Sequence, residues 1–93
     1  MSEKRVIWKF AVPMAESFLI QMPEGAEMLC VQMQRDEPQL WALVDPDAPK
    51  APRNFTIMGT GKKYTKQSTK NLKYVGTFQS GTYVWHLFDG RLI

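Results

Sequence analysis

The stretch "MLCVQMQRDEPQLWALV", residues 28–44, decides the fold class. Apolar and polar side chains alternate through its first half, which is the period of a β-strand with one buried face. The alternation puts Leu29, Val31 and Met33 on one face and Cys30, Gln32 and Gln34 on the other. The residues "DEP", 36–38, then turn the chain into a second apolar run, so the stretch predicts a hairpin.

The same two-residue period recurs on both sides of this hairpin. Further short strands are predicted at 6–12, 17–22, 54–59, 72–79 and 82–88, with the last two joined at the Ser-Gly of 80–81. The segment "DPDAPKAPR", 45–53, holds three prolines and is predicted to be a loop. Only "MAES", 14–17, is a candidate for a helical turn.

These elements predict an all-β fold in one domain spanning residues 1–93. About seven short strands separated by Gly, Pro and Asp are typical of a small antiparallel β-sandwich or barrel. Sheets this small leave edge strands that can pair with another chain. The chain also ends on apolar Leu92 and Ile93, so we expect a homo-oligomer.

Composition indicates a soluble, intracellular protein. Hydrophobic residues make up 44% of the chain and charged residues 23%, as in ordinary globular proteins. No run of apolar residues approaches the length of a membrane span or of the core of a signal peptide. The single cysteine, Cys30, has no partner for an internal disulfide. We therefore expect a cytoplasmic protein, without membrane contact, in the cell where it acts.

Charge is distributed unevenly along the chain. The net charge is only +3, yet residues 1–47 hold four basic and eight acidic side chains, whereas residues 48–88 hold seven basic and no acidic ones. A patch of one sign attracts opposite charge over about one Debye length. The expected partner is therefore an anion.

The basic residues concentrate in "RNFTIMGTGKKYTKQSTKNLKY", residues 53–74. Its two glycines allow positive φ angles, so that successive backbone N–H groups can surround an anion, and Tyr64 can stack on a base. The glycine spacing is not that of a nucleotide phosphate loop. The alternative is a solvated hairpin loop whose lysines keep an edge soluble. The candidate ligand-binding residues are Arg53, Gly59, Thr60, Gly61, Lys62, Lys63, Tyr64 and Lys66.

Catalytic and metal-binding residues are not predicted. The only histidine, His86, alternates with apolar residues in a strand and is interpreted as a half-buried structural residue. One histidine and one cysteine in separate strands do not form a metal site or a nucleophile–base pair. Asp45 and Asp47 are interpreted as turn formers. We expect no catalytic residues, no metal, no cofactor and no enzymatic activity.

The three tryptophans, Trp8, Trp41 and Trp85, lie at alternating strand positions and are predicted to be mostly core. A tryptophan exposed beside the basic loop would instead provide a platform for a stacked base.

Several strings together resemble a family of small phage and prophage proteins of unknown function. They are "IWKF" at 7–10, "MPEGAEML" at 22–29, "LWALVDPDAPK" at 40–50, "GTG" at 59–61 and "YVGTFQ" at 74–79. The resemblance implies a compact all-β accessory protein, encoded by a phage, with no activity assigned. The lysine-rich "KKYTKQSTKN", 62–71, replaces the short polar turn expected there.

Two functions follow as hypotheses. The first is a binding module that sequesters an anionic small molecule, such as a nucleotide or a cyclic nucleotide immune signal. The alternative is an inhibitor that docks its basic face on an acidic host defence protein. Nucleic-acid binding is weaker than either, because no recognised nucleic-acid module is visible in the sequence.

Overall fold

Two antiparallel sheets face each other in the computed structural model of this chain, which describes residues 3–93. In chain order, the elements are β1 (Val6–Ala11), β2 (Ser17–Pro23), β3 (Glu27–Gln34), β4 (Glu37–Val44), β5 (Lys50–Gly59), α1 (Lys66–Thr69), β6 (Lys73–Ser80) and β7 (Tyr83–Asp89). One sheet has the order β1-β4-β3 and the other the order β2-β5-β7-β6. The predicted all-β fold is confirmed as a small sandwich, and within residues 3–93 the sheets do not close into a barrel.

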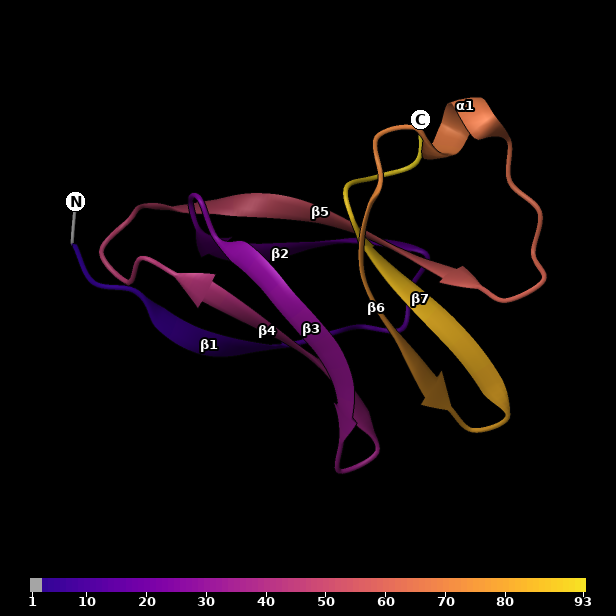
Figure 1. Cartoon of the computed structure of the whole chain (residues 1–93), viewed down its shortest axis with the longest axis horizontal. Helices are drawn as coiled ribbons and strands as arrows, with labels where there is room; N and C mark the ends of the chain where they lie inside the picture. Colours follow the sequence, from indigo (N-terminus) through magenta and orange to yellow (C-terminus); the bar gives the residue numbers. More distant parts are fainter. Residues whose placement is uncertain (1–2) are drawn as a thin grey trace.

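The sheets approach each other most closely where β3 and β6 lie side by side (Figure 1). Gly76 of β6 faces Val31 of β3, and a Cβ added at Gly76 would lie 2.8 Å from Val31 Cγ1. Such a contact is too short for a real side chain. Glycine therefore allows the two strands to pack edge to edge without pairing.

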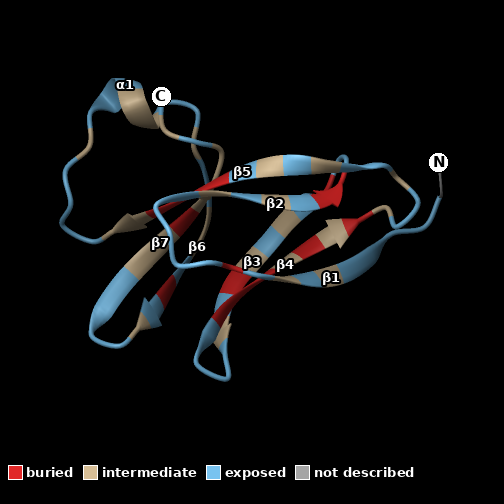
Figure 2. Ribbon diagram, turned by 180° about the vertical axis from the view of Figure 1, so that it is seen from behind, coloured by how far each residue is buried: buried red, intermediate tan, exposed pale blue. Residues whose placement is uncertain are grey.

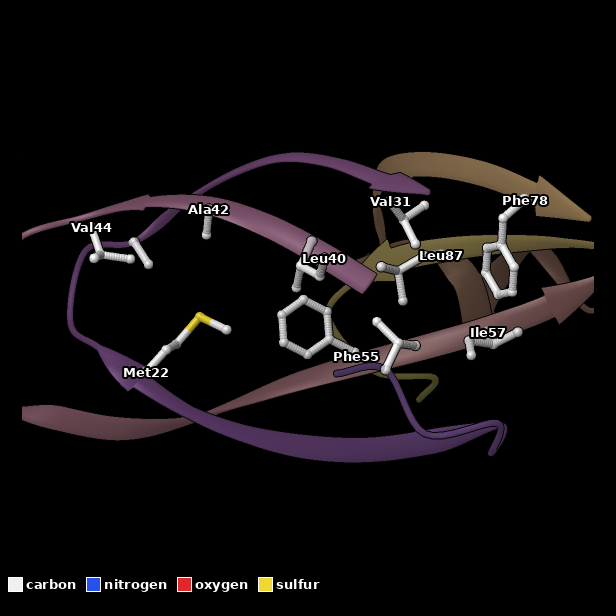
Figure 3. Packing of buried hydrophobic residues seen from close by; sticks show 11 residues of the cluster. Met22, Val31, Leu40, Ala42, Val44, Phe55, Ile57, Phe78 and Leu87 are labelled. Atoms are coloured by element: carbon white, nitrogen blue, oxygen red, sulfur yellow. The ribbon is translucent and has the colours of Figure 1, made fainter. Parts of the chain in front are cut away.

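The core lies between the sheets, and Figure 2 shows its buried stretches along β4, β5 and β7. Figure 3 shows Met22, Leu40 and Phe55 pointing toward one another from opposite sheets. Burying a side chain of this size stabilises the fold by about 1.5–3 kcal/mol. The buried hydrophobic residues are Val12, Met22, Ala26, Val31, Leu40, Ala42, Val44, Phe55, Ile57, Phe78 and Leu87.

The β3–β4 hairpin is confirmed, but its turn differs from the predicted one. Gln34 pairs with Glu37, so the two turn residues are Arg35 and Asp36, at φ 52° and 66°. Two positive φ angles define a type I′ turn, which matches the twist of the flanking strands. The prediction that Glu37 and Pro38 form the turn is wrong, because both begin β4.

The prediction that Leu29 shares one face of β3 with Val31 and Met33 is wrong. The pairing of β3 with β4 shifts between Met28 and Cys30, which marks a β-bulge. A bulge adds one residue to one strand and reverses the facing of the residues before it. Leu29 is therefore 41% exposed, while Val31 is buried.

The proline-rich segment is partly a strand, whereas the sequence predicted a loop over residues 45–53. Asp45 does form a turn, since its Oδ1 accepts the N–H of Asp47 at 2.9 Å. However, β5 already begins at Lys50, and Pro52 lies opposite Gln21 of β2. Proline is tolerated there because β7 reaches only as far as Phe55, which leaves that part of β5 on an edge.

The single turn of helix also lies elsewhere than predicted. Residues 14–16 form a bend, and the helical turn is α1, inside the lysine-rich segment. Thr65 caps it, because its Oγ1 accepts the N–H of Ser68 at 3.1 Å. Within residues 3–93, no helix is long and apolar enough to cross a bilayer.

Two of the three tryptophans pack against the core, as predicted, and one does not. Trp8 and Trp85 are partly buried against it. Trp41 pairs with Lys9 and Cys30 and lies on the outer face of the three-stranded sheet. Its neighbours in β4, Leu40 and Ala42, are the residues that point into the core. The prediction of a core residue is therefore wrong for Trp41.

Candidate ligand-binding site

A cavity of about 570 Å³ opens at one end of the sandwich, where three segments meet. These are the link between β1 and β2, the end of β5 with the loop that follows it, and the β6–β7 turn with the start of β7. Pockets that take small molecules are typically about 300–1,000 Å³ and mostly apolar. The size and position of this cavity make it the candidate site.

Aromatic rings form much of the cavity wall. Tyr83 and Trp85 project from β7 with ring centroids 5.9 Å apart and planes tilted by 45°. Tyr83 is 67% exposed, so its ring is accessible to a ligand. A Cβ at Gly59 would lie 3.2 Å from Cζ3 of Trp85, so the absence of a side chain there leaves room for the indole.

Tyr64 contributes a third ring from the loop after β5. Its hydroxyl is buried and has no hydrogen-bond partner among residues 3–93. The ammonium group of Lys62 lies 5.5 Å from the centroid of the Tyr64 ring, within cation–π distance. A buried hydroxyl without a partner costs about 1–3 kcal/mol, which favours a site where a polar group can approach it.

An ion pair between Lys62 and Glu16 lies at the rim of the cavity, with Nζ and Oε1 separated by 3.2 Å. Both side chains are more than half exposed, so the pair itself adds little stability. The Glu16 carboxylate, through its hydrogen bond and its charge, raises the pKa of Lys62, and Tyr64 contributes in the same direction. Lys62 is therefore charged throughout the neutral pH range.

The loop that carries Lys62 is fixed by hydrogen bonds. The N–H of Lys62 donates to the carbonyl of Gly59, and Gly61 takes a φ of 88°, as a type II turn requires. The N–H of Thr60 donates to the carbonyl of Val84. Both N–H groups are thus used within the chain, so the predicted backbone cradle for an anion is not available at Thr60 and Lys62.

His86 supports this loop from the outer face of the sheet. Its Nε2 lies 2.7 Å from Thr60 Oγ1, and its Nδ1 lies 2.9 Å from Thr77 Oγ1. Both ring nitrogens of the half-buried side chain are therefore engaged, which confirms the structural role predicted for His86. Among residues 3–93, no three His, Cys, Asp or Glu side chains gather where they could hold a metal ion.

Comparison with known proteins places the chain in a family. Residues 3–92 match the family described as "Domain of unknown function (DUF7352)". The chain belongs to the DUF7352 family. No curated protein and no solved structure matches it. The family description assigns no activity, so the function of this DUF7352 domain must be argued from its own cavity.

The structure brings together half of the residues predicted for the site. Gly59, Thr60, Lys62 and Tyr64 line the cavity. Gly61 shapes the turn between them.

The other predicted residues lie outside the cavity lining. Lys63 follows on the exposed loop, and Lys66 is exposed on α1. Arg53 is part of the scaffold instead. Its guanidinium forms two hydrogen bonds to the carboxylate of Asp89, the shorter 2.6 Å, and a third to the carbonyl of Ala26 at 2.9 Å.

Sequence reasoning missed Glu16 and Tyr83 and treated Trp85 as a core residue. Glu16 is far from the lysine loop in sequence, and only the pairing of β2 with β5 brings it near Lys62. A signal for Tyr83 was present, because an aromatic residue directly after a glycine-containing hairpin turn lies at a strand end, where the opposite sheet no longer covers it.

Proposed function

We propose that this DUF7352 protein is a non-enzymatic binding module for a small anionic molecule with a flat ring, such as a nucleotide. The observation that carries this function is the 570 Å³ cavity walled by Tyr64, Tyr83 and Trp85 beside a lysine-bearing loop. Each stacked base contributes about 1–3 kcal/mol in proteins that bind bases on aromatic side chains.

Charge favours an anionic ligand. Lys62 lies at the cavity rim and Lys63 next to it, in a region where residues 48–88 contain no acidic side chain. Glu16 neutralises part of this charge, but Lys63 is exposed and has no ion pair among residues 3–93. A phosphate would therefore be drawn to the loop while the ring enters the cavity.

The resemblance to phage proteins extends this function to a biological role. A phage-encoded protein that holds a nucleotide tightly would remove a nucleotide signal on which a host defence depends. This role rests on the resemblance alone. The test is to measure phage infection of a bacterial host that expresses the protein and of the same host without it.

The experiment is a titration of the purified protein with GMP and AMP in a calorimeter, together with a search for a nucleotide released on denaturation. Tyr83→Ala should weaken binding about tenfold or more, because it removes an exposed stacking surface. The double variant Lys62→Glu and Lys63→Glu should abolish binding. The matched control, Lys66→Glu with Lys70→Glu, makes the same charge change outside the cavity and should keep the affinity. If neither nucleotide binds and none is released, the binding-module function is wrong.

The exposed lysines outside the cavity favour a second candidate, docking on an acidic protein. Lys63, Lys66, Lys70 and Lys73 are all exposed, and none has an ion pair among residues 3–93. If the Lys66 and Lys70 double variant loses function in cells while the Tyr83 variant retains it, docking replaces ligand binding as the function.

We also propose that the protein associates with itself. Among residues 3–93, strand β1 pairs on one side only, with β4, and Ile7 on this strand is 55% exposed. An open edge with apolar side chains favours pairing with a second copy. Light scattering should give a mass above 10.7 kDa, and a constant mass of 10.7 kDa at all concentrations would contradict self-association.

A further inference from the structure

The rim of the cavity presents a donor and an acceptor side by side. Lys62 Nζ and Glu16 Oε1 are 3.2 Å apart, and both side chains remain accessible. An ammonium group only donates hydrogen bonds and an ionised carboxylate only accepts them. A base stacked on the aromatic wall would turn its polar edge toward this pair. The pair therefore offers a means of distinguishing one base from another.

We propose that the base is guanine, with Lys62 donating to O6 and the Glu16 carboxylate accepting from N1–H and N2–H. This assignment rests on the proposed binding of a nucleotide in the cavity. Guanine alone among the common bases places two neighbouring donors beside an acceptor, so both carboxylate oxygens can be used. Adenine and cytosine offer the carboxylate only one donor group, and uracil brings carbonyl oxygens next to it.

Glu16 and Lys62, the two residues that would recognise the base, both lie on backbone that is fixed by hydrogen bonds. The carbonyl of Glu16 accepts the N–H of Ile57 in β5 at 2.9 Å, so the β1–β2 link is tied to the sheet. Lys62 follows the turn closed by its own N–H and the carbonyl of Gly59. Recognition groups on a fixed backbone discriminate more sharply than groups on a mobile one.

The neighbouring lysine, Lys63, is then available to bind the phosphate. Lys63 is exposed, follows Lys62 directly and has no ion pair among residues 3–93. Because Lys62 donates to O6, Lys63 is the cation next to it in the sequence that can bind a 5′-phosphate. The ligand class is therefore a guanine nucleotide rather than a guanine base or nucleoside.

The test is calorimetric titration of the full chain with GMP, IMP and AMP at the same pH and salt concentration. IMP retains O6 and N1–H but lacks the 2-amino group. We expect GMP to bind about tenfold or more tightly than AMP, with IMP between them, because a good two-point contact to a base discriminates by about 1–3 kcal/mol. Guanosine should bind more weakly than GMP and should show less dependence on salt.

Glu16→Gln should reduce the GMP affinity about tenfold and bring it close to that of AMP, because an amide offers one acceptor oxygen where the carboxylate offers two. Glu24→Gln is the matched control, since Glu24 is exposed on the β2–β3 turn and does not line the cavity. It should leave all three affinities unchanged. Circular dichroism of both variants verifies that the fold is retained.

The outcomes separate the guanine site from the binding module itself. Equal binding of GMP and AMP, or tighter binding of AMP, combined with weakening of both by Tyr83→Ala, overturns guanine recognition and leaves the nucleotide module intact. An undiminished GMP preference in Glu16→Gln overturns the role of Glu16. No binding of any of the three nucleotides, with none released on denaturation, overturns both.

Discussion

The inward-facing residues of β7 lie partly in the core and partly in the cavity. The opposite sheet covers one end of this face and leaves the other end open. Leu87 is fully buried under the opposite sheet, whereas Tyr83, on the same face four residues earlier, is 67% exposed. Trp85, between them, contacts the core and also lines the cavity. The alternation that directs a side chain inward therefore does not determine whether a second sheet covers it. In this fold the uncovered part of an inward face becomes a candidate binding surface.

The largest expected effect compares the two ends of this face directly. Leu87→Ala should destabilise the fold by about 2–5 kcal/mol, because it leaves a cavity in a closed core. Tyr83→Ala should change the free energy of unfolding by only about 0.5 kcal/mol while weakening ligand binding. Urea unfolding of both variants measures the difference. Similar losses of stability would mean that the two ends do not differ as their exposure indicates.

A second comparison separates the scaffold from the site among the basic residues. Arg53→Gln should destabilise the fold by about 1–3 kcal/mol, because the partly buried Asp89 carboxylate loses its partner. GMP affinity at a temperature where the variant is folded should not change. Lys50→Gln, an exposed position on the same strand, is the control and should stay within about 0.5 kcal/mol. A loss of affinity in Arg53→Gln without loss of stability would return Arg53 to the site.

A third change lies outside the cavity lining, at the tip of the β3–β4 hairpin. Arg35→Asn with Asp36→Gly should stabilise the fold by about 1 kcal/mol, because these residues accept the positive φ angles of a type I′ turn more readily than Arg and Asp. The melting temperature should rise and GMP affinity should not change. A fall in melting temperature would show that the Arg35 side chain contributes stability that outweighs its backbone strain.

The smallest effect concerns the ion pair at the rim. The pKa of Lys62 in the folded protein is raised above its ordinary value of 10.5 by Glu16. Its contribution to stability is therefore fully present below about pH 10.5 and is lost as the pH rises through the higher folded value. The difference in melting temperature between the native chain and Lys62→Gln should be constant at neutral pH and should shrink only in strong alkali. A difference that disappears between pH 7 and 9 would contradict this assignment.

How much of this molecule the sequence predicts depends on whether a feature is local. Alternation predicts the strands that became β1 and β2 and the existence of both hairpins, because each depends on residues close together in the chain. It fails at Leu29, since the bulge arises from the pairing of β3 with β4 rather than from either strand alone. It also fails at Pro52, because only the sheet order shows that this part of β5 is an edge.

The candidate site divides in the same way. The lysine loop, with Lys62 and Tyr64, is evident from its composition. Glu16 comes to it only through the packing of a distant segment, and the exposure of Tyr83 depends on how far the other sheet extends. Charge patterning therefore locates one wall of the cavity, and the tertiary structure adds the aromatic wall and the acidic partner.

The order in which the strands join has a consequence for the kinetics of folding. The β3–β4 and β6–β7 hairpins close through two-residue turns. In contrast, β2 pairs with β5, and the whole β3–β4 hairpin lies between these two strands in the sequence. Non-local pairings of this kind generally form late because loop closure costs entropy. That pairing also places Glu16 against the lysine loop, so we expect the cavity to be completed after the folding transition state. A ligand bound there should then slow unfolding and leave the folding rate unchanged. Stopped-flow unfolding and refolding with and without GMP would measure both rates, and a faster folding rate with GMP would place the cavity in the folding nucleus instead.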